Sequence, residues 1–279
     1  MPELPEVETI KSALDKAIKG AKILDTKVFC RRFRVPIPDC FEQKTICATI
    51  TDIKRIAKYI VLELDNKHSI IWHLGMSGKI KICESVPQDL QKHDHAVFYT
   101  DKGVIIFNDA RRFGMLDIIE SAKLNEHFAF KNLGIDPFDE KLTADYLKQK
   151  LKNKKTPIKV ALLDQSVING IGNIYASEAL YSAKISPLRE SYTLSLTECE
   201  SLIEAIKETL TKAIKAGGST LRDYAKPDGS TGYFQNEHCV YNKTGQACPN
   251  CCCNLKTTKG IKKIVQAGRS TFYCQTLQK

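Results

Sequence analysis

Hydrophobic residues are spaced for a helix at the start of the chain and for strands after it. An apolar stripe at three- and four-residue steps predicts a helix over residues 3–19, with Gly20 at a C-cap position. The stripe consists of Val7, Ile10, Leu14 and Ile18. Eight short β-type runs follow, at Ile23–Val28, Ile46–Ile53, Tyr59–Leu64, Ile70–Leu74, Lys79–Cys83, Ala96–Tyr99, Val104–Phe107 and Met115–Ile119. Eight strands at this spacing, with a hairpin signal at Asp101-Lys102-Gly103, indicate a β-sandwich or a barrel.

A second block begins where the composition changes, at the linker-like stretch Gly134-Ile135-Asp136-Pro137. Helical spacing then recurs at Thr143–Leu151, Pro157–Leu163, Ile174–Ala183 and Leu196–Ala216. The last helix ends at Gly217-Gly218, and its N-cap is Ser195 or Thr197, the latter with Glu200 in capping-box position. A polar stretch leads on to a cysteine-rich tail. The pattern predicts an α+β protein with three parts, over residues 1–134, 135–234 and 235–279.

Composition narrows the class of protein. Hydrophobic residues make up 43% and charged residues 27%, as in an ordinary globular protein. We see neither a signal peptide nor an apolar run of the roughly 18 residues that a membrane span needs, so we expect a cytoplasmic protein without membrane association. The 42 Lys and Arg exceed the 32 Asp and Glu, for a net charge of +10. This excess suits a polyanion such as nucleic acid, although an unspecialised basic enzyme fits the charge equally well.

The first residues, Met1-Pro2-Glu3, carry a candidate for covalent catalysis. A small second residue favours removal of the initiator methionine, which would leave Pro2 with a free secondary amine. Nearby cations or a helix N-terminus lower the pKa of such an amine. Its attack on a carbonyl carbon gives an iminium, which acts as an electron sink, and Glu3 is a neighbouring acid or base. The alternative is an ordinary helix start with proline and acidic residues in the first turn.

A glycine-bearing turn lies between two predicted helices. It contains Gly170-Ile171-Gly172, and Asn173 opens the next helix. Backbone N–H groups at such a helix start bind phosphates, and helix–turn–helix elements often dock on nucleic-acid backbones. Lys154, Lys155 and Lys159 add positive charge upstream. A tight turn between helices without a binding role remains the alternative.

The tail contains a candidate metal site. Cys248-Pro249-Asn250-Cys251 has the spacing of a zinc knuckle, and Cys274 follows, but Leu277 occupies the position of a fourth cysteine. Three thiolates do not close a tetrahedral zinc site. The candidates for a fourth ligand are Cys252, Cys253, Cys239 and His238.

A third set of residues lies in turns of the first part. Lys58 precedes a strand, Met76 lies in Gly75-Met76-Ser77-Gly78, and Phe113 follows Arg111-Arg112. Apolar side chains in such turns are either core residues at strand ends or wedges that enter a base stack beside an arginine.

Taken together, these residues resemble the bacterial formamidopyrimidine-DNA glycosylase family over nearly the whole chain. The matching motifs, in order, are Pro2-Glu3-Leu4-Pro5-Glu6-Val7-Glu8-Thr9, Ala57-Lys58-Tyr59, His73-Leu74-Gly75-Met76-Ser77-Gly78, His93-Asp94-His95, Arg111-Arg112-Phe113-Gly114, Gly170-Ile171-Gly172-Asn173-Ile174-Tyr175-Ala176-Ser177-Glu178, Gly217-Gly218-Ser219-Thr220-Leu221-Arg222-Asp223-Tyr224 and Arg269-Ser270-Thr271-Phe272-Tyr273-Cys274. The resemblance implies an N-terminal helix with an eight-stranded β-sandwich, a helix-two-turn-helix domain and a C-terminal β-hairpin zinc finger.

The resemblance also implies a reaction. The expected activity is excision of oxidised purines from double-stranded DNA, followed by β,δ-elimination at the abasic site. Pro2 would be the nucleophile at the sugar C1′, and Glu3 would donate a proton to the sugar or the base. Lys58 would donate a proton in β-elimination, and Arg269 would hold a phosphate and assist δ-elimination. The residues expected to support this site are Glu6 and Glu178.

The implied DNA contacts fall into three groups. Met76, Arg111 and Phe113 would fill the gap left by a flipped base, with Arg111 reading the orphan cytosine. The residues expected to hold the DNA backbone are His93, Lys154, Asn173 and Arg269. Lys159 is expected to tune recognition of the damaged base, and the loop expected to cover that base contains Ser219, Thr220 and Tyr224. The partner is therefore DNA, and the protein is expected to act as a monomer.

The tail departs from the family pattern, which has two Cys-x-x-Cys pairs. Cys248, Cys251 and Cys274 match three of the expected ligands of one structural zinc ion, Leu277 replaces the fourth, and the interval before Cys274 is longer than expected. This departure motivates an alternative, a non-catalytic homologue that binds damaged DNA. A second alternative is a sibling glycosylase that prefers oxidised pyrimidines, although Glu3-Leu4-Pro5 favours the purine-specific type.

Overall fold

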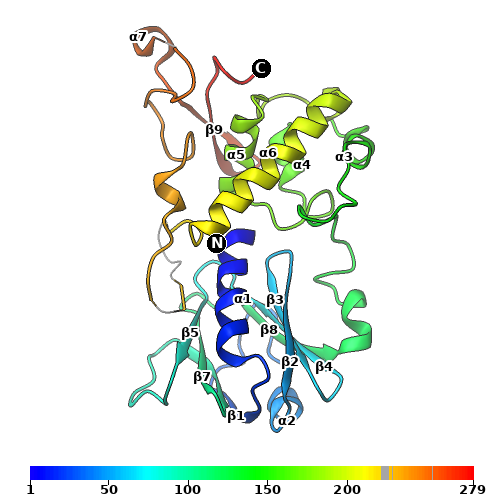
Figure 1. Cartoon of the computed structure of the whole chain (residues 1–279), viewed down its shortest axis with the longest axis vertical. Helices are drawn as coiled ribbons and strands as arrows, with labels where there is room; N and C mark the ends of the chain where they lie inside the picture. The colour runs from blue at the N-terminus through cyan, green and yellow to red at the C-terminus, as the bar shows by residue number, and fades with distance from the viewer. Residues whose placement is uncertain (221–225, 228, 253) are drawn as a thin grey trace. The chain divides into compact units, whose positions relative to one another are not determined.

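The computed structural model describes residues 1–220, 226–227, 229–252 and 254–279. It divides into two compact units (Figure 1), and each unit combines segments that are distant in the sequence. The first unit contains Met1–Lys131 and Ala216–Tyr233. The second contains Asn132–Lys215 and Phe234–Lys279, so the helical block and the tail share one unit. The three-part division by sequence stays a prediction, because these units follow contacts rather than chain order.

The first unit is a sandwich of two four-stranded antiparallel sheets with one long helix, α1 (Leu4–Ile18). One sheet has the order β2-β3-β4-β8, with β2 at Ile50–Ile56, β3 at Tyr59–Leu64, β4 at His68–His73 and β8 at Met115–Glu120. The other has the order β1-β6-β7-β5, with β1 at Ile23–Val28, β6 at Asp94–Thr100, β7 at Gly103–Asn108 and β5 at Lys79–Cys83. The predicted β-sandwich is therefore confirmed.

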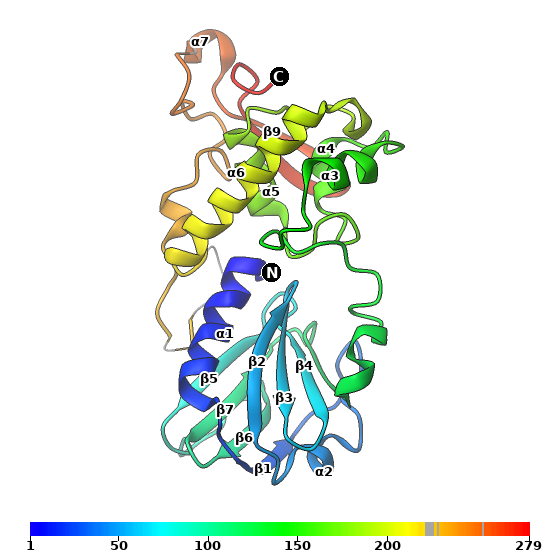
Figure 2. The same ribbon diagram turned by 45° about the vertical axis from the view of Figure 1, so that its right-hand side comes forward.

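The apolar stripe of α1 completes the core of the sandwich. The helix contacts strands of both sheets, namely β2, β3 and β5 (Figure 2). Val7, Ile10, Leu14 and Ile18 are almost fully buried in the same cluster as the inward-facing strand residues, including Trp72. A stripe of four buried aliphatic residues gains roughly 1.5–3 kcal/mol per side chain from the hydrophobic effect. This burial anchors the start of the chain to a rigid scaffold.

One strand begins later than its hydrophobic run predicts. The run Ile46–Ile53 suggests a strand from its first residue, but α2 (Phe41–Thr45) ends immediately before it. Ile46 is the C-cap of this helix, and Cys47 has a left-handed backbone with φ of 65°. The chain must turn here before it can pair with β3, so β2 starts at Ile50. A 3-10 helix, η1 (Ser121–Glu126), also follows the last strand of the sandwich and was not predicted.

The second unit contains the four predicted helices and a two-stranded hairpin. The helices are α3 (Ala144–Leu151), α4 (Ile158–Leu162), α5 (Asn173–Ser182) and α6 (Leu196–Lys215). Ser195 is the N-terminal cap of α6: its hydroxyl accepts from the Glu198 N–H, and the Glu198 carboxylate accepts from the Ser195 N–H. This reciprocal pair is a capping box, so the alternative box at Thr197 and Glu200 is wrong.

The hairpin lies in the tail, where β9 (Lys262–Gln266) pairs with β10 (Arg269–Tyr273). Ala267 and Gly268 connect them with positive φ angles of 45° and 73°, which suits a tight hairpin turn. Within the long interval between Cys251 and Cys274, the chain forms the short helix α7 (Leu255–Thr258) ahead of this hairpin. Two short 3-10 helices, η2 (Ser191–Thr193) and η3 (Phe234–Asn236), complete the elements of this unit.

None of the helices in the described part of the chain combines the length and apolar surface that a membrane crossing requires.

Candidate active site

Strand register brings five predicted site residues of the first unit to one end of the sandwich. In the first sheet, His73 pairs with both Tyr59 and Met115, so the chain segments beside these residues meet at one edge. These segments carry Lys58, the Gly75–Gly78 turn and the Arg111–Gly114 turn. In the second sheet, Asn108 pairs with both Lys79 and Asp94, which brings His93 to the same end. Residues dispersed over much of the first unit thus form one surface.

Lys58 is held at this edge in a buried position, with 8% of its surface exposed. Ala57 before it has a left-handed backbone with φ of 54°. Arg55 fixes the segment to helix α1, because its guanidinium donates to the Glu8 carboxylate at 2.7 Å and to the Ala57 carbonyl at 3.1 Å. The position of Lys58 therefore depends on the same helix that carries the N-terminus.

His73 adjoins Lys58 and is uncharged at neutral pH. Burial, and then the charge of Lys58, lower the pKa of its imidazole to about 4. Its Nδ1 accepts a hydrogen bond from the Gly75 N–H at 3.1 Å. The neutral ring therefore orients the turn that carries Met76 without adding charge near Lys58.

A buried carboxylate holds the two turns together. Asp109 is fully buried, and its side chain accepts from the Ser77 hydroxyl at 2.5 Å and from the Gly114 N–H at 2.8 Å. A longer bond of 3.3 Å comes from the Arg111 N–H. Charge-assisted hydrogen bonds of this kind are about twice as strong as neutral ones. Asp109 therefore sets the geometry from which Met76, Arg111 and Phe113 project.

The turns also approach each other too closely for a side chain at Gly75. A Cβ atom there would lie 2.4 Å from the backbone of Phe113, and φ is +59°. Met76 and Phe113 are 40% and 47% exposed, and the Arg111 guanidinium carbon lies 4.8 Å from the Phe113 ring centre. Exposed apolar side chains beside a stacked arginine favour the wedge interpretation over the core interpretation.

The N-terminus is the second part of the site. Pro2 is buried and precedes helix α1, whose N-cap is Glu3 in a capping box with Glu6. The Glu6 carboxylate accepts from the Glu3 N–H at 2.7 Å and from the Ser219 N–H at 2.7 Å. Glu6 thereby joins the first residues to a loop that follows more than two hundred positions later. A Cβ atom on Gly218 would meet the Glu6 carboxylate oxygen at 2.8 Å, which explains a glycine there.

The expected base-covering loop is described only in part. Ser219 is buried, and the Thr220 hydroxyl accepts from the Gly232 N–H at 2.8 Å. Tyr224 lies outside the described residues. The described bonds fix the beginning of this loop to the N-terminal helix through Glu6.

In the second unit, Lys159 lies in the interior of the fold. Its side chain is fully buried and donates to Asn173 Oδ1 at 2.6 Å, to the Ser270 carbonyl at 3.0 Å and to the Thr271 hydroxyl at 2.7 Å. The Asn173 amide also donates to the Ser270 carbonyl at 2.9 Å. Lys159 thus joins the start of α5 to the hairpin strand that begins with Arg269. Its expected part in recognition of the damaged base stays a prediction.

The other expected backbone contacts of this unit are more accessible. Lys154 is about one-third exposed and forms an ion pair of 2.9 Å with Asp164. Gln165 shapes the turn before α5 by accepting from the Gly170 N–H and donating to the Ile171 carbonyl. Arg269 is exposed at the tip of the hairpin. Because the hairpin register is regular, the longer tail does not disturb this arginine locally.

Glu178 organises the chain segment ahead of the hairpin. Its carboxylate accepts three backbone N–H groups, from Cys239 at 2.8 Å, Val240 at 3.0 Å and Tyr241 at 2.7 Å. Burial nevertheless raises the pKa of Glu178 above its usual value. Glu178 therefore stabilises a segment within the second unit, the one that carries Tyr241.

Sequence reasoning gave no role to three residues that position this site: Arg55, Asp109 and Tyr241. The Tyr241 hydroxyl accepts from the Asn173 amide at 3.3 Å, and its ring packs against Phe272. Tyr241 lies in an irregular segment without periodicity, so no pattern marks it. Arg55 and Asp109 do adjoin predicted site residues in the sequence, which is the only signal that points to them.

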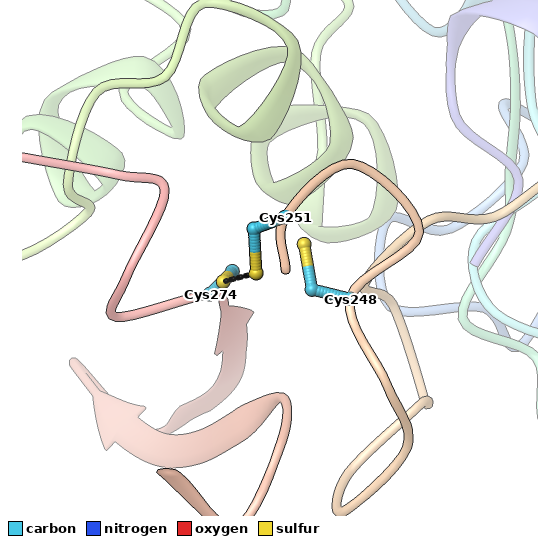
Figure 3. A group of neighbouring side chains, drawn as sticks. All are labelled: Cys248, Cys251 and Cys274. Carbon is cyan, nitrogen blue, oxygen red and sulfur yellow. Dashed lines mark hydrogen bonds between the residues drawn. The ribbon is translucent and has the colours of Figure 1, made fainter. Parts of the chain in front are cut away.

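Three cysteines of the tail form one cluster (Figure 3). The thiols of Cys248, Cys251 and Cys274 lie within 4.8 Å of one another, and those of Cys251 and Cys274 are 3.6 Å apart. Such a group can bind a metal ion. Of the other proposed ligands, Cys239, Cys252 and His238 are not part of this cluster as described, and Cys253 lies outside the described residues. Leu277 packs against the cluster as an apolar residue.

Comparisons with known proteins agree with this arrangement. Residues 1–116 match the model of the formamidopyrimidine-DNA glycosylase N-terminal domain, and residues 133–225 match the model of the formamidopyrimidine-DNA glycosylase H2TH domain. The formamidopyrimidine-DNA glycosylase of Rhizobium etli is 41% identical over the full length of both chains. That of Rickettsia africae is 44% identical and covers 100% of this chain and 99% of its own.

Solved structures are similar over the same extent. The Fpg protein of Lactococcus lactis in complex with abasic-site DNA is 35% identical, covers both chains fully and has a TM-score of 0.90. A variant of the same protein with DNA that contains Fapy-dG has the same identity, coverage and TM-score. The helix start, the sandwich edge and the hairpin, together with these matches over the whole chain, establish that this chain belongs to the formamidopyrimidine-DNA glycosylase family.

Proposed function

We propose that this protein excises oxidised purines from double-stranded DNA and then cleaves the strand at the resulting abasic site. The observation that carries the proposal is the start of the chain, where Pro2 is buried beside Glu3 and the Glu6 carboxylate bonds both Glu3 and Ser219. This arrangement places the secondary amine that remains after removal of Met1 beside a carboxylate, which is the pair that covalent amine catalysis requires. The relatives' names and their DNA-bound structures support the same class of substrate.

The reaction begins at the Pro2 amine once Met1 has been removed. The amine attacks the sugar C1′, the glycosidic bond breaks, and the base leaves with a proton. Glu3 supplies a proton to the base or to the sugar ring oxygen, which opens the ring and leaves an iminium at C1′. The positive iminium nitrogen acidifies the C2′ proton, whose removal expels the 3′-phosphate in β-elimination. Loss of the C4′ proton then expels the 5′-phosphate in δ-elimination.

The surrounding residues bring the sugar to the amine. A flipped nucleotide costs a few kcal/mol in unstacking, which Met76, Phe113 and Arg111 offset by filling the vacated space. Lys58 contacts phosphate and donates a proton during β-elimination. The backbone contacts that we assign are His93, Lys154, Asn173 and Arg269. Lys159 holds Asn173 and the Arg269 strand.

Base release from defined duplexes tests this function. We expect the protein to release 8-oxoguanine opposite cytosine and to nick the product strand, while an unmodified duplex stays intact. The measurement is a single-turnover time course with separate readouts for free base and strand cleavage. Salt-dependent binding to lesion DNA without base release would instead indicate the non-catalytic homologue.

A preference for oxidised pyrimidines is the second candidate activity. It is suggested by a solved structure of the Lactococcus lactis Fpg bound to DNA that contains an oxidised pyrimidine, to which this chain is 35% identical at a TM-score of 0.89. Parallel time courses with thymine glycol decide between the two activities. Faster release of thymine glycol than of 8-oxoguanine would overturn the purine assignment.

We also propose that Cys248, Cys251 and Cys274 hold one structural zinc ion. The 3.6 Å between the Cys251 and Cys274 sulfurs is close to the roughly 3.8 Å expected for two thiolates about 2.3 Å from one tetrahedral zinc ion, while Leu277 supplies packing in place of a fourth thiolate. When bound, zinc would cross-link the strand end at Cys274 to the Cys248–Cys251 knuckle. The ion has no role in the chemical steps. A DNA substrate places the protein in the compartment that holds the genome, which agrees with the expected cytoplasmic location.

Metal content per chain tests the zinc site. We expect about one zinc per chain in the purified protein and a loss of most of it in Cys251→Ser, because two thiolates are a poor zinc site. Cys47→Ser is the matched control, since Cys47 is exposed and lies outside the second unit. Thermal unfolding with and without a chelator gives a readout independent of activity. Equal metal content in the protein and in Cys251→Ser would contradict the assignment.

A further inference from the structure

A hollow lined by four arginines lies next to the proposed wedge, and its function is not explained by the wedge. It has a volume of about 370 Å³. Its lining residues are Arg32, Phe33, Arg34, Arg111, Arg112 and Phe113. Two chain segments build it, the loop after β1 and the turn after β7, and both belong to the first unit.

The positive charge in this hollow is not neutralised locally. Among the residues that the structure describes, no carboxylate forms an ion pair with any of the four arginines of the hollow. The neighbouring Arg31 shows the contrast, because its guanidinium bonds the Glu42 carboxylate at 2.5 Å and the Pro38 carbonyl at 2.7 Å. Guanidinium groups cannot lose their charge in proteins. Four of them around one space repel each other, and an anion in that space relieves the repulsion.

The loop is held in place mainly by contacts that do not use the four guanidiniums, apart from a long bond of 3.9 Å from the Arg112 guanidinium to Cys30 Sγ. Phe33 is buried, stacks on Phe107 at 5.5 Å and meets the His95 ring edge-on at 5.3 Å. The Arg34 N–H donates to the Arg112 carbonyl at 3.4 Å, which joins the two segments. Arg112 has a left-handed backbone with φ of 54°, a conformation that costs a non-glycine residue roughly 1 kcal/mol or more. The hollow is thus a preformed feature.

We propose that this hollow binds a backbone phosphate of the DNA strand opposite the lesion, with Arg32 and Arg34 as its principal ligands. The inference rests on the proposed function, in which Arg111 and Phe113 occupy the gap beside the orphan base. The phosphates flanking that nucleotide are then the nearest anions to Arg32, Arg34 and Arg112. Arginine pairs with phosphate through two parallel hydrogen bonds, so a cluster of this kind holds it more specifically than lysines would.

The contact has a definite purpose in recognition. If the protein bound only the backbone phosphates of the damaged strand, the opposite strand would be free to move when a base is flipped. A phosphate held in the hollow fixes the backbone of the opposite strand against the wedge. Arg32 and Arg34 are therefore positioning residues for the orphan nucleotide.

The first experiment measures binding without catalysis. An Arg32→Gln, Arg34→Gln double variant is titrated by fluorescence anisotropy with a duplex that contains a stable abasic analogue. We expect its Kd to rise about tenfold and the slope of log Kd against log salt to shrink by about one for each phosphate that the variant no longer binds. The matched control is Lys16→Gln, Lys67→Gln, which removes the same charge from the last turn of α1 and from the turn between β3 and β4. Its Kd is expected to change by no more than about twofold.

A second experiment identifies the phosphate. Single phosphates of the opposite strand are replaced in turn by uncharged methylphosphonates near the orphan base. At one position we expect the methylphosphonate to weaken binding of the wild-type protein about tenfold. The same replacement should leave the affinity of the Arg32→Gln, Arg34→Gln variant unchanged, because this variant no longer binds that phosphate. Additive effects at every position would overturn the proposal, and so would a variant that binds like the control.

A free anion is the alternative occupant. If inorganic phosphate stabilises the wild-type protein against thermal unfolding but not the variant, and no methylphosphonate position couples to the arginines, the hollow is a phosphate site unrelated to the opposite strand. The binding assays also separate this proposal from the function. The protein could show the coupling between the arginines and one methylphosphonate position and still release no oxidised base. That result would support the phosphate contact and contradict the proposed enzymatic function.

Discussion

Replacing Pro2 with glycine is expected to abolish trapping of the protein on abasic or 8-oxoguanine DNA by borohydride. Base excision should fall by about 1,000-fold or more, as when other enzymes are deprived of their nucleophile. The proline ring fixes the nitrogen at the buried start of α1 and makes it a secondary amine, whose adduct with C1′ is an iminium without further protonation. Glycine has neither property. The measurement is the amount of covalent protein–DNA adduct after reduction, resolved on a denaturing gel.

Two companion proteins make this result interpretable. Pro5→Ala removes a proline from the first turn of the helix and leaves the amine intact, so it should be trapped like the wild type. A chain that retains Met1 keeps the Pro2 ring but converts its nitrogen into an amide, so it should not be trapped. Mass spectrometry of the intact proteins establishes which form is present. Efficient trapping of the Met1-containing form would show that another amine, such as Lys58, is the nucleophile.

Glu3→Gln is expected to slow base release by about 100- to 10,000-fold, the usual contribution of a positioned acid or base. The amide oxygen can still accept the hydrogen bond from the Glu6 N–H, so the capping box and the fold are preserved. The slower rate therefore reports on the missing proton. Cleavage of a preformed abasic site should fall less, because no base needs to be released. Single-turnover rates on the two substrates give both values.

A variant that loses a carboxylate far from the N-terminus tests whether the slower base release of Glu3→Gln is specific to Glu3. Glu63→Gln removes a carboxylate on β3 that pairs with Lys54 at 2.6 Å, at the end of the strand away from Lys58. It should release 8-oxoguanine at the wild-type rate. An equal reduction in both variants, or an equal reduction of Glu3→Gln on both substrates, would remove Glu3 from the proton-transfer step.

Local structure could largely be predicted because it depends on neighbouring residues. Strands β1, β3 and β5 have the bounds that their hydrophobic runs predict. The helix at the start was anticipated from a stripe of four aliphatic residues, all of which are buried. Where a run was misread, at Ile46–Ile53, the cause was an interruption that leaves no hydrophobic signal, a left-handed residue at Cys47. Family membership was likewise visible in the order of short motifs.

The residues that we propose as chemically active, Pro2, Glu3, Lys58 and Arg269, were also identified from sequence motifs alone. The contacts that surround these residues could not be predicted from the sequence. The bond from Ser219 to Glu6 and the three bonds of Lys159 join residues separated by many intervening positions. Periodicity describes only which face of an element is apolar, so it does not reveal such partners. For this reason the sequence did not reveal that Lys159 is buried against Asn173 and the hairpin.

The sequence by itself determined most of the helices and strands and the family, and it predicted the nucleophile at the start of the chain. Only the tertiary structure decided which turns meet at the sandwich edge, that Asp109 holds the wedge, and that Arg32 and Arg34 face Arg111 and Arg112 across one hollow. The physical reason is the range of the interactions. Propensity and hydrophobic spacing act over a few residues, whereas strand register and buried hydrogen bonds depend on how distant segments pack.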